Sequence, residues 1–592
     1  MSDRIRRLEF RLGPLSRLLP YLKRYGRQLW IGVLTVLATN IAAVVAPWIL
    51  REAVDYLKAG EVNQKTLIFY ASFILLVSLV EGIFRFLMRR ILIGVSRLIE
   101  YDLRNDLFAH LQLLSSSFYQ RHSTGDIMAR ATNDLSAVRS VLGPGIMYSI
   151  NTLFTTILTI SVLFTISPRL AILTLIPLVA VSLSVKHFGH QIHQLFEKIQ
   201  EQFSWITTVA QENVAGIRVV KAYNQEEAFI ERFRQANDEY LQRSLSLVRV
   251  QGIFQPLLAF LLGLSLVGLL WYGGRQVVLG TITLGDFVAF MAYLAMLTWP
   301  TIALGFVINI FERGAASMRR INRLMDVQLD IEDRDVKHID QIRGEIEVRN
   351  LTFSYNGAPV LKNVSFHVPA GNSLAIVGRT GSGKSTLVNL LCRLYPVPDG
   401  TIFIDGEEIN RIPLNTLRKS IGYVPQDAFL FSETIRQNIA FGDPNAPEEK
   451  IREAAEISNI LPDIESFPGG FKTFVGERGV TLSGGQKQRL SISRALLIRP
   501  RILILDDSLS AVDTQTEEQI LERLSHQLKH CTAILISHRI STIKMADEII
   551  VLDKGRIVER GSHTELLQHN GYYADLYQRQ LLKEELEQDE AR

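Results

Sequence analysis

Long stretches without charged side chains dominate the first half of the chain. Six such runs cover residues 28–50, 66–80, 140–168, 170–185, 250–274 and 287–311. A helix needs ~20 mostly apolar residues to cross a bilayer, and the second run reaches that length only if it continues through Glu81 to Met88. The turn at Ser167, Pro168 and Arg169 divides the third run from the fourth. The pattern predicts six transmembrane helices and disfavours the alternative, buried core helices of a large soluble domain.

The segments around these runs predict the orientation. Residues 1–27 carry Arg4, Arg6, Arg7, Arg11, Arg17, Lys23, Arg24 and Arg27. A flank this basic stays in the cytoplasm, so the N-terminus and everything after the sixth helix are expected there. The outer connections are then short, and the inner connections, residues 89–139 and 186–249, are long. We expect both inner connections to be helical extensions with polar breaks at residues 122–126 and 223–227, where a soluble domain would make contact.

Beyond residue 324 the apolar runs give way to charge, and short β-rich segments then alternate with helical ones. That alternation is typical of an α/β domain. The sequence therefore predicts an all-α membrane domain over residues 1–324, a linker over residues 325–345 and an α/β domain over residues 346–592.

The composition is typical of a membrane protein, and the charge is distributed unevenly between the two parts of the chain. Of 592 residues, 47% are hydrophobic and 21% are charged, whereas about a quarter of the residues of a soluble chain are charged. Residues 1–320 hold 32 Lys and Arg against 21 Asp and Glu, so the remainder of the chain is acidic although the net charge is +4. The two cysteines, Cys392 and Cys531, exclude a disulfide scaffold, and we expect both to be small buried residues.

A glycine-rich segment in the second half carries candidate chemistry. Residues 378–385 read GRTGSGKS, which matches the P-loop motif, and they lie between a strand-like and a helix-like segment, as that motif requires. Its backbone N–H groups can surround phosphates. Lys384 is expected to reach the β- and γ-phosphates, and Ser385 to bind Mg²⁺.

A second motif strengthens this interpretation. Residues 501–507 read RILILDD, an apolar strand-like run after Arg501 that ends in Asp506 and Asp507. Buried parallel strands read as continuous apolar runs, and a carboxylate at the end of such a strand can hold Mg²⁺ beside the P-loop. The expected fold is a membrane all-α domain of six transmembrane helices with long cytoplasmic extensions, followed by an α/β P-loop ATPase domain.

Between these two motifs, residues 482–486 read LSGGQ. The soluble half thereby resembles the ATP-binding cassette (ABC) domain, whose signature motif this segment matches. Further landmarks follow the family order: Tyr355 for adenine stacking, Gln426 in the Q-loop, residues 475–479 ahead of the signature, residues 510–513 in the D-loop and the switch residue His538. The membrane half is similar to that of ABC exporters, so the resemblance covers nearly the whole chain.

The resemblance implies a half-transporter with ATP and Mg²⁺ as cofactors. Two chains would enclose ATP between the P-loop of one and the signature of the other. It assigns nucleotide contacts to Tyr355, Gly378, Arg379, Thr380, Gly381, Ser382, Gly383, Lys384, Ser385, Thr386, Ser483, Gly484, Gly485, Gln486 and Asp513. It assigns Mg²⁺ to Ser385, Gln426 and Asp506, and catalysis to Asp507, His538 and Gln426.

One position departs from the family pattern. The residue after the Mg²⁺-binding Asp is usually the general base Glu, and here it is Asp507. Its side chain is shorter by about 1.5 Å, and a misplacement of ~1 Å can reduce a rate on the order of 10²-fold. We therefore expect this chain's own site to bind ATP and hydrolyse it slowly. The intact signature would complete the site of a second half-transporter, which favours a heterodimer over a homodimer with two slow sites.

The expected activity is ATP-driven export of amphipathic drugs or lipids from the cytoplasm or inner leaflet. The expected partners are a second half-transporter, the transported compound and the membrane lipids. A regulatory ATP-sensing subunit or an ATP-gated channel is the alternative. Six membrane spans argue against a nucleic-acid partner, although the first half is basic. The expected location is the plasma (inner) membrane, with several passes and with the nucleotide-binding domain in the cytoplasm.

Overall fold

The computed structural model describes residues 13–60, 63–333, 335–337, 339, 341–355, 357–476, 479, 481–579 and 581. The predicted basic residues Arg4, Arg6, Arg7 and Arg11 lie outside this part, as do Glu477 and Arg478 in the loop at residues 475–479. Contacts divide the chain into two compact units. The first is Met1–Gln112 with Ser123–Val327, and the second is Leu113–His122 with Gln328–Arg592.

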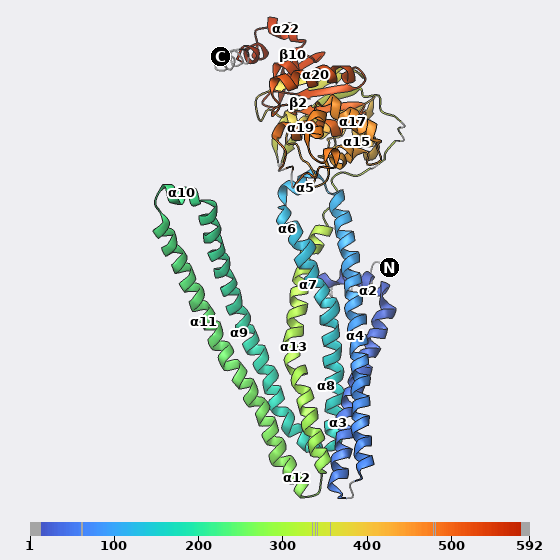
Figure 1. Ribbon diagram of the computed structural model, residues 1–592, viewed down its shortest axis with the longest axis vertical. Helices are drawn as coiled ribbons and strands as arrows, with labels where there is room; N and C mark the ends of the chain where they lie inside the picture. The colour runs from blue at the N-terminus through green and yellow to red at the C-terminus, as the bar shows by residue number, and fades with distance from the viewer. Residues whose placement is uncertain are drawn as a thin grey trace. The chain divides into compact units, whose positions relative to one another are not determined.

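The first unit is built from long helices (Figure 1). Within the described residues, six helical paths are long and apolar enough to cross a membrane: Gly26–Lys58, Gln64–Leu113, Thr124–Ile166, Pro168–Ala215, Glu226–Val278 and Leu284–Met325. Four of these paths are single helices: α3 (Gly26–Lys58), α4 (Gln64–Leu113), α9 (Pro168–Ala215) and α13 (Leu284–Met325). The third path consists of α6 (Thr124–Ala129), η2 (Arg130–Asp134), α7 (Leu135–Ser140), η3 (Val141–Gly145) and α8 (Ile146–Ile166). The fifth consists of α11 (Glu226–Gly268), η4 (Leu269–Gly273) and α12 (Gly274–Val278). The prediction of six spans is confirmed.

Short helices complete this unit. At the amino-terminal side, η1 (Gly13–Leu18) and α2 (Leu19–Arg24) precede α3. Between α9 and α11 lies α10 (Ile217–Ala222), and Asn224 adopts a φ of +52° in the turn that follows it. The chain therefore reverses direction within the second predicted polar break.

Three contacts show how the long helices pack. Along the α9–α11 pair, which runs side by side in Figure 1, Phe188 stacks on Phe254 with 5.3 Å between ring centroids. Helix α13 packs on α3, where the Tyr293 hydroxyl donates to the Val44 carbonyl at 2.8 Å. A Cβ atom on Gly285 of α13 would lie 2.2 Å from the Arg51 carbonyl, so only glycine permits this close approach of the two helices.

The second unit contains two sheets. The larger has the order β10-β9-β3-β8-β7-β6 and the smaller β2-β1-β4-β5. The large sheet is parallel apart from its edge strand β10. The strands are β1 (Ile346–Tyr355), β2 (Ala358–Val368), β3 (Ser373–Gly378), β4 (Ile402–Ile404), β5 (Glu407–Glu408), β6 (Ile421–Val424), β7 (Ile502–Asp506), β8 (Thr532–Ile536), β9 (Glu548–Asp553) and β10 (Arg556–Gly561).

Helices cover the large sheet, and some of them form a helical region of their own. They are α14 (Lys384–Leu391), η5 (Ile409–Arg411), α15 (Leu414–Ser420), α16 (Ile435–Ile439), η6 (Ala440–Gly442), α17 (Glu448–Ile457), α18 (Leu461–Ser466), η7 (Gly470–Lys472), α19 (Gly484–Leu497), α20 (Thr514–Leu528), α21 (Ile540–Ile543) and α22 (His563–Gln568). Alternate residues of β7 belong to different cores, Ile504 to one and Leu503 to another. Both faces of the sheet are therefore buried, which explains the continuous apolar strands. Cys392 and Cys531 are buried and are not joined by a disulfide, as expected.

One segment between the membrane helices belongs to the second unit. Helix α5 (Ser116–Arg121) buries Phe118, and the hydroxyls of Ser115 and Ser117 donate to the Asp330 carboxylate at 2.9 and 3.1 Å. The Ser116 N–H donates to the Leu394 carbonyl at 3.4 Å. The contact with the soluble domain is thus made just ahead of the predicted polar break at residues 122–126, which instead begins α6, with Ser123 as its N-cap.

Candidate ATP-binding site

The carboxyl ends of four parallel strands meet at one edge of the large sheet. Strands β3, β6, β7 and β8 run in the same direction, and Asp506 at the end of β7 is level with Ile536 at the end of β8. The predicted site residues Gln426, Asp507 and His538 lie within two residues of the ends of β6, β7 and β8. Because parallel α/β sheets bind ligands at this edge, the topology brings these residues towards the P-loop.

The P-loop has a backbone that requires glycine. Gly378, Gly381 and Gly383 have φ values of +156°, +82° and +105°. A Cβ atom on Gly378 would lie 2.1 Å from the Leu552 carbonyl, and one on Gly383 would lie 2.7 Å from the Leu361 side chain. The chain therefore turns sharply from β3 into α14 and leaves the first N–H groups of that helix open, where an anion is favoured.

Polar groups inside this loop fit a phosphate ligand. The Lys384 ammonium is almost completely buried and donates to the carbonyls of Gly378 and Arg379 at 2.8 and 3.1 Å. The Ser382 hydroxyl is buried and, among the described residues, has no hydrogen-bond partner. A buried hydroxyl is normally satisfied. An oxygen-rich anion that enters the loop would supply the missing partner and draw Lys384 off the carbonyls.

Charges of both signs meet next to the loop. Burial raises the pKa of Asp506, against the opposing effects of a hydrogen bond from Ser385 and the positive charge of Lys384. Burial also lowers the pKa of Lys384, whereas the carboxylates of Asp506 and Asp507 act in the other direction. The predicted metal-binding pair Ser385 and Asp506 is therefore in contact, and a divalent cation bound there would neutralise the negative charge of Asp506 and Asp507.

Asp507 is fixed through its main chain. Its N–H donates to the Ile536 carbonyl at 2.8 Å, and its carbonyl accepts from the Ser510 hydroxyl at 2.9 Å. Its φ is +48°, a conformation that Asp and Asn adopt more readily than most residues. With the backbone held on both sides, the reach of the carboxylate depends on the length of its side chain.

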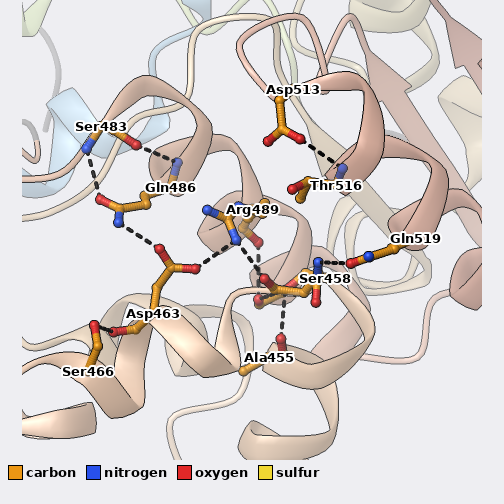
Figure 2. A network of polar contacts seen from close by, with 12 residues as sticks. Ala455, Ser458, Asp463, Ser466, Ser483, Gln486, Arg489, Asp513, Thr516 and Gln519 are labelled. Carbon is orange, nitrogen blue, oxygen red and sulfur yellow. Dashed lines mark hydrogen bonds and ion pairs between the residues drawn. The ribbon is translucent and has the colours of Figure 1, made fainter.

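The signature segment forms a preorganised helix start, shown in Figure 2. The Ser483 hydroxyl accepts from the Gln486 N–H at 3.2 Å, and the Gln486 side chain accepts from the Ser483 N–H at 2.9 Å. Asp463 of α18 binds both Gln486 and Arg489, each at 2.8 Å. In the described part of the chain, no hydrogen bond or ion pair joins this segment to the P-loop.

Comparisons with known proteins cover nearly the whole chain. Residues 29–301 match the ABC transporter transmembrane region, and residues 361–510 match the ABC transporter family. A probable multidrug resistance ABC transporter ATP-binding/permease protein of Bacillus subtilis, YheI, is 38% identical over 96% of this chain and 98% of its own. The multidrug resistance-like ATP-binding protein MdlA of Escherichia coli is 35% identical, over 96% and 98%. The ATP-dependent lipid A-core flippase of Syntrophus aciditrophicus is 34% identical, over 98% and 97%.

This chain belongs to the ABC transporter family. A bacterial Atm1-family ABC exporter solved with ATP bound superimposes with a TM-score of 0.79 at 30% identity, over 94% of this chain and 98% of that one. The chain is an ABC exporter half-transporter, with one transmembrane region and one ATP-binding domain. It is a multi-pass membrane protein whose cytoplasmic domain is an ATPase coupled to transport.

In this ABC transporter the signature helix is joined to the D-loop. Gln488 of α19 donates to the Ser510 hydroxyl at 2.9 Å and accepts from the Ala511 N–H at 2.8 Å. Ser510 in turn donates to the Asp507 carbonyl. Asp513 ends the D-loop as the N-cap of α20 and accepts from the Thr516 N–H at 2.9 Å. These bonds connect the signature of the chain to the end of its own strand β7.

A buried carboxylate holds the segment after the switch histidine. Glu517 of α20 is fully buried and accepts from the Ser541 and Thr542 hydroxyls at 2.6 and 3.0 Å. It also pairs with Arg539, which donates to the Ser510 carbonyl at 3.1 Å. Because Arg539 follows the exposed residue His538 directly, Glu517 is a positioning residue for the switch loop and the D-loop.

Two predicted nucleotide contacts, Tyr355 and Arg379, lie against protein side chains in this structure. The Tyr355 hydroxyl is 3.4 Å from the Thr386 hydroxyl, and its ring packs against Tyr395. The Arg379 guanidinium lies over the Tyr572 ring, 5.6 Å from its centroid. Gln426 is exposed. Only the backbone of Arg379, through its carbonyl, touches the P-loop lysine.

The sequence prediction missed Asp463, Glu517, Gln488 and helix α5. A signal existed for the first, because the Ser-x-x-Gln spacing of Ser483 and Gln486 is a capping box and marks a helix start that other residues can support. For Glu517 and Gln488 no local signal exists, since an isolated polar residue on a helix reads as solvent-exposed.

Proposed function

We propose that this chain is the weakly hydrolysing subunit of a heterodimeric ABC exporter that moves amphipathic drugs or lipids out of the cytoplasm or inner leaflet. The observation that carries the proposal is Asp507 at the position of the general base, on a backbone fixed by Ile536 and Ser510. The fixed backbone cannot advance to compensate for a side chain about 1.5 Å shorter than Glu. Its own site then binds ATP and turns it over slowly.

The residues present support ATP binding at this site. Gly378, Gly381 and Gly383 shape the loop, Lys384 and Ser382 would contact phosphate oxygens, and Tyr355 is available to the adenine once it leaves Thr386. Ser385 and Asp506, with Gln426, would hold Mg²⁺. ATP supplies the phosphoryl group whose transfer to water drives the cycle, and His538 lies at the same edge of the sheet to contact it.

The signature supports activity in a partner's site. Ser483 and Gly484 are exposed at the start of α19, and the capping box is held by Asp463. A partner with Glu after its Mg²⁺-binding Asp would supply the P-loop and the general base of that site. Because Gln488 and Ser510 join this signature to Asp507, closure at one site is expected to be transmitted to the other.

Exposed apolar surface supports a paired chain. None of the most apolar stretch of α4 is buried. On α10, Val219 is exposed, and so is Tyr223 at its end. We propose that a second half-transporter covers part of α4 and that its soluble domain receives α10, while α5 contacts the soluble domain of its own chain through Phe118.

The substrate class is drawn from the relatives. Two of them are named for multidrug resistance and one for lipid A-core flipping. A drug or a lipid of this kind is amphipathic, which suits a pathway between apolar helices that opens to the membrane. We therefore propose amphipathic compounds or lipids as substrates.

The proposal is tested by the steady-state ATPase activity of the purified chain alone in nanodiscs, beside photolabelling with 8-azido-ATP. We expect normal labelling and turnover on the order of 10²-fold below that of a site with a Glu base. Rapid, cooperative turnover by the chain alone would show that Asp507 serves as the base in a homodimer, which would contradict the heterodimer and leave the exporter intact.

The role of Asp463 gives a second test. Asp463→Asn places an amide N–H against the donors of Gln486 or Arg489, and loss of such a charged hydrogen bond costs about 1.5–3 kcal/mol. We expect hydrolysis in the site that this signature completes to fall about 10-fold, with 8-azido-ATP labelling of Lys384's own site unchanged. Glu465→Gln, on the same helix α18, removes only an exposed ion pair with Arg452 and is the matched control. Equal activity of the two variants would exclude a positioning role.

Asp507 also favours a second function, an ATP-sensing regulatory or channel subunit in which hydrolysis is incidental. The two functions differ in the direction of transport. Uphill movement of an amphipathic dye into inverted vesicles supports the exporter, and dissipation of a gradient in either direction supports the channel.

A further inference from the structure

Two arginines at the outer end of the first unit lack a neutralising carboxylate. Among the described residues, neither Arg169 at the start of α9 nor Arg275 in α12 has an ion pair or side-chain hydrogen bond, whereas Arg51 on the same side pairs with Asp286 at 2.8 Å. Lys and Arg normally collect on the cytoplasmic side of membrane proteins. Two unpaired guanidinium groups on the outer side therefore call for an anionic ligand.

Both arginines line one cavity. It has a volume of about 350 Å³, and its other lining residues are Leu173, Trp271 and Tyr272. This volume is at the lower end of the ~300–1,000 Å³ range of small-molecule sites, which suits a phosphate with its glycerol rather than a large solute. The cavity combines two cations with an apolar and aromatic wall.

The helices around the cavity are held in place. The Ser167 hydroxyl, in the turn before α9, donates to the Gln276 side chain at 3.2 Å, and Gln276 is next to Arg275. Gly273 is buried, and a Cβ atom there would lie 3.3 Å from Leu170. The turn that carries Arg169 is thus joined to α12 next to Arg275.

The cavity lies at the boundary between water and hydrocarbon. The apolar run of residues 170–185 begins directly after Arg169, and the run of residues 250–274 ends directly before Arg275. Trp and Tyr favour this depth, and the Trp271 side chain is 75% exposed. A ligand would therefore meet guanidinium groups at its head and Trp271 and Leu173 along its tail.

We propose that this cavity binds the phosphate group of an anionic phospholipid in the outer leaflet, distinct from any transported substrate. Arginine binds phosphate through paired N–H groups, and two positive charges favour a lipid with net negative charge over a zwitterionic one. The apolar wall and the position at the boundary favour a lipid over a free anion. Such a lipid would hold the turn between α8 and α9 against α12.

Quenching of Trp271 fluorescence by brominated lipid tests this site. The full chain is placed in phosphatidylcholine nanodiscs that contain brominated phosphatidylglycerol or brominated phosphatidylcholine at equal fractions, and Trp271→Phe isolates the Trp271 signal. We expect half-quenching at an at least twofold lower fraction of the brominated phosphatidylglycerol. Equal quenching by the two lipids would overturn the proposal.

Variants identify the groups responsible. The double variant Arg169→Ala, Arg275→Ala should abolish the preference for phosphatidylglycerol over phosphatidylcholine. The double variant Arg169→Lys, Arg275→Lys keeps both charges and should retain part of this preference. Labelling with 8-azido-ATP checks that each variant is folded. Lys65→Ala is the matched control, because it removes one exposed outer charge away from the cavity. A preference that survives the double Ala variant would overturn the proposal. Loss of the preference in millimolar inorganic phosphate would show a soluble-anion site and exclude the lipid.

Discussion

Replacement of Asp507 by Glu is expected to raise ATP turnover by the chain alone on the order of 10²-fold. In the wild type the backbone N–H of Asp507 bonds to Ile536 at 2.8 Å and its carbonyl bonds to Ser510 at 2.9 Å. The main chain therefore stays where it is, and the added methylene moves the carboxylate about 1.5 Å towards the expected position of the attacking water. The measurement is the steady-state ATPase rate of both proteins in nanodiscs.

Two controls separate chemistry from stability. Asp507→Asn keeps the shape and removes the base, so its turnover should not exceed that of the wild type. The φ of +48° at this position suits Asp better than Glu, and we expect a loss of about 1 kcal/mol in unfolding free energy for Asp507→Glu. A turnover that does not rise, in a variant that still labels with 8-azido-ATP, would show that side-chain length does not limit this site.

The parts of the fold that could be predicted are those in which one local pattern has one physical cause. Strand β7 is apolar up to Asp506 because Ile504 packs into one core and Leu503 into another. The six spans carry few charges because each must lie in hydrocarbon. The P-loop could be recognised because Gly378 and Gly383 occupy backbone conformations that exclude other residues.

The remainder depends on contacts between distant residues. Asp463 supports a helix start that begins at Ser483, and Glu517 binds hydroxyls at Ser541 and Thr542. The docking of α5 depends on Asp330, far along the chain from Ser115. No periodicity records such pairs, because each partner alone is an ordinary polar residue. These residues surround the predicted motifs without belonging to them.

Lys384→Ala is expected to weaken ATP binding to this chain about 10- to 100-fold, since a hydrogen bond to a charged group contributes about 1.5–3 kcal/mol. The ammonium is buried and, among the described residues, bonds only to the carbonyls of Gly378 and Arg379, so it can move to a phosphate. Its removal also leaves Asp506 and Asp507 without the cation beside them, and these carboxylates then repel the incoming phosphates. Equilibrium titration with a fluorescent ATP analogue gives the affinity, and Lys544→Ala, an exposed lysine outside the site, is the control.

The same variant decides whether a slowly hydrolysing site is still needed for transport. If both ATP molecules must be bound before the cytoplasmic domains close, Lys384→Ala in this chain should abolish dye uptake into inverted vesicles that hold the assembled transporter, even though the partner's site is chemically intact. The link from Gln488 through Ser510 to Asp507 gives a physical route for this dependence. Uptake that continues unchanged would show that nucleotide at the Asp507 site takes no part in the cycle, which would contradict the need for two bound ATP molecules and leave this subunit only its signature and its membrane helices as contributions to export.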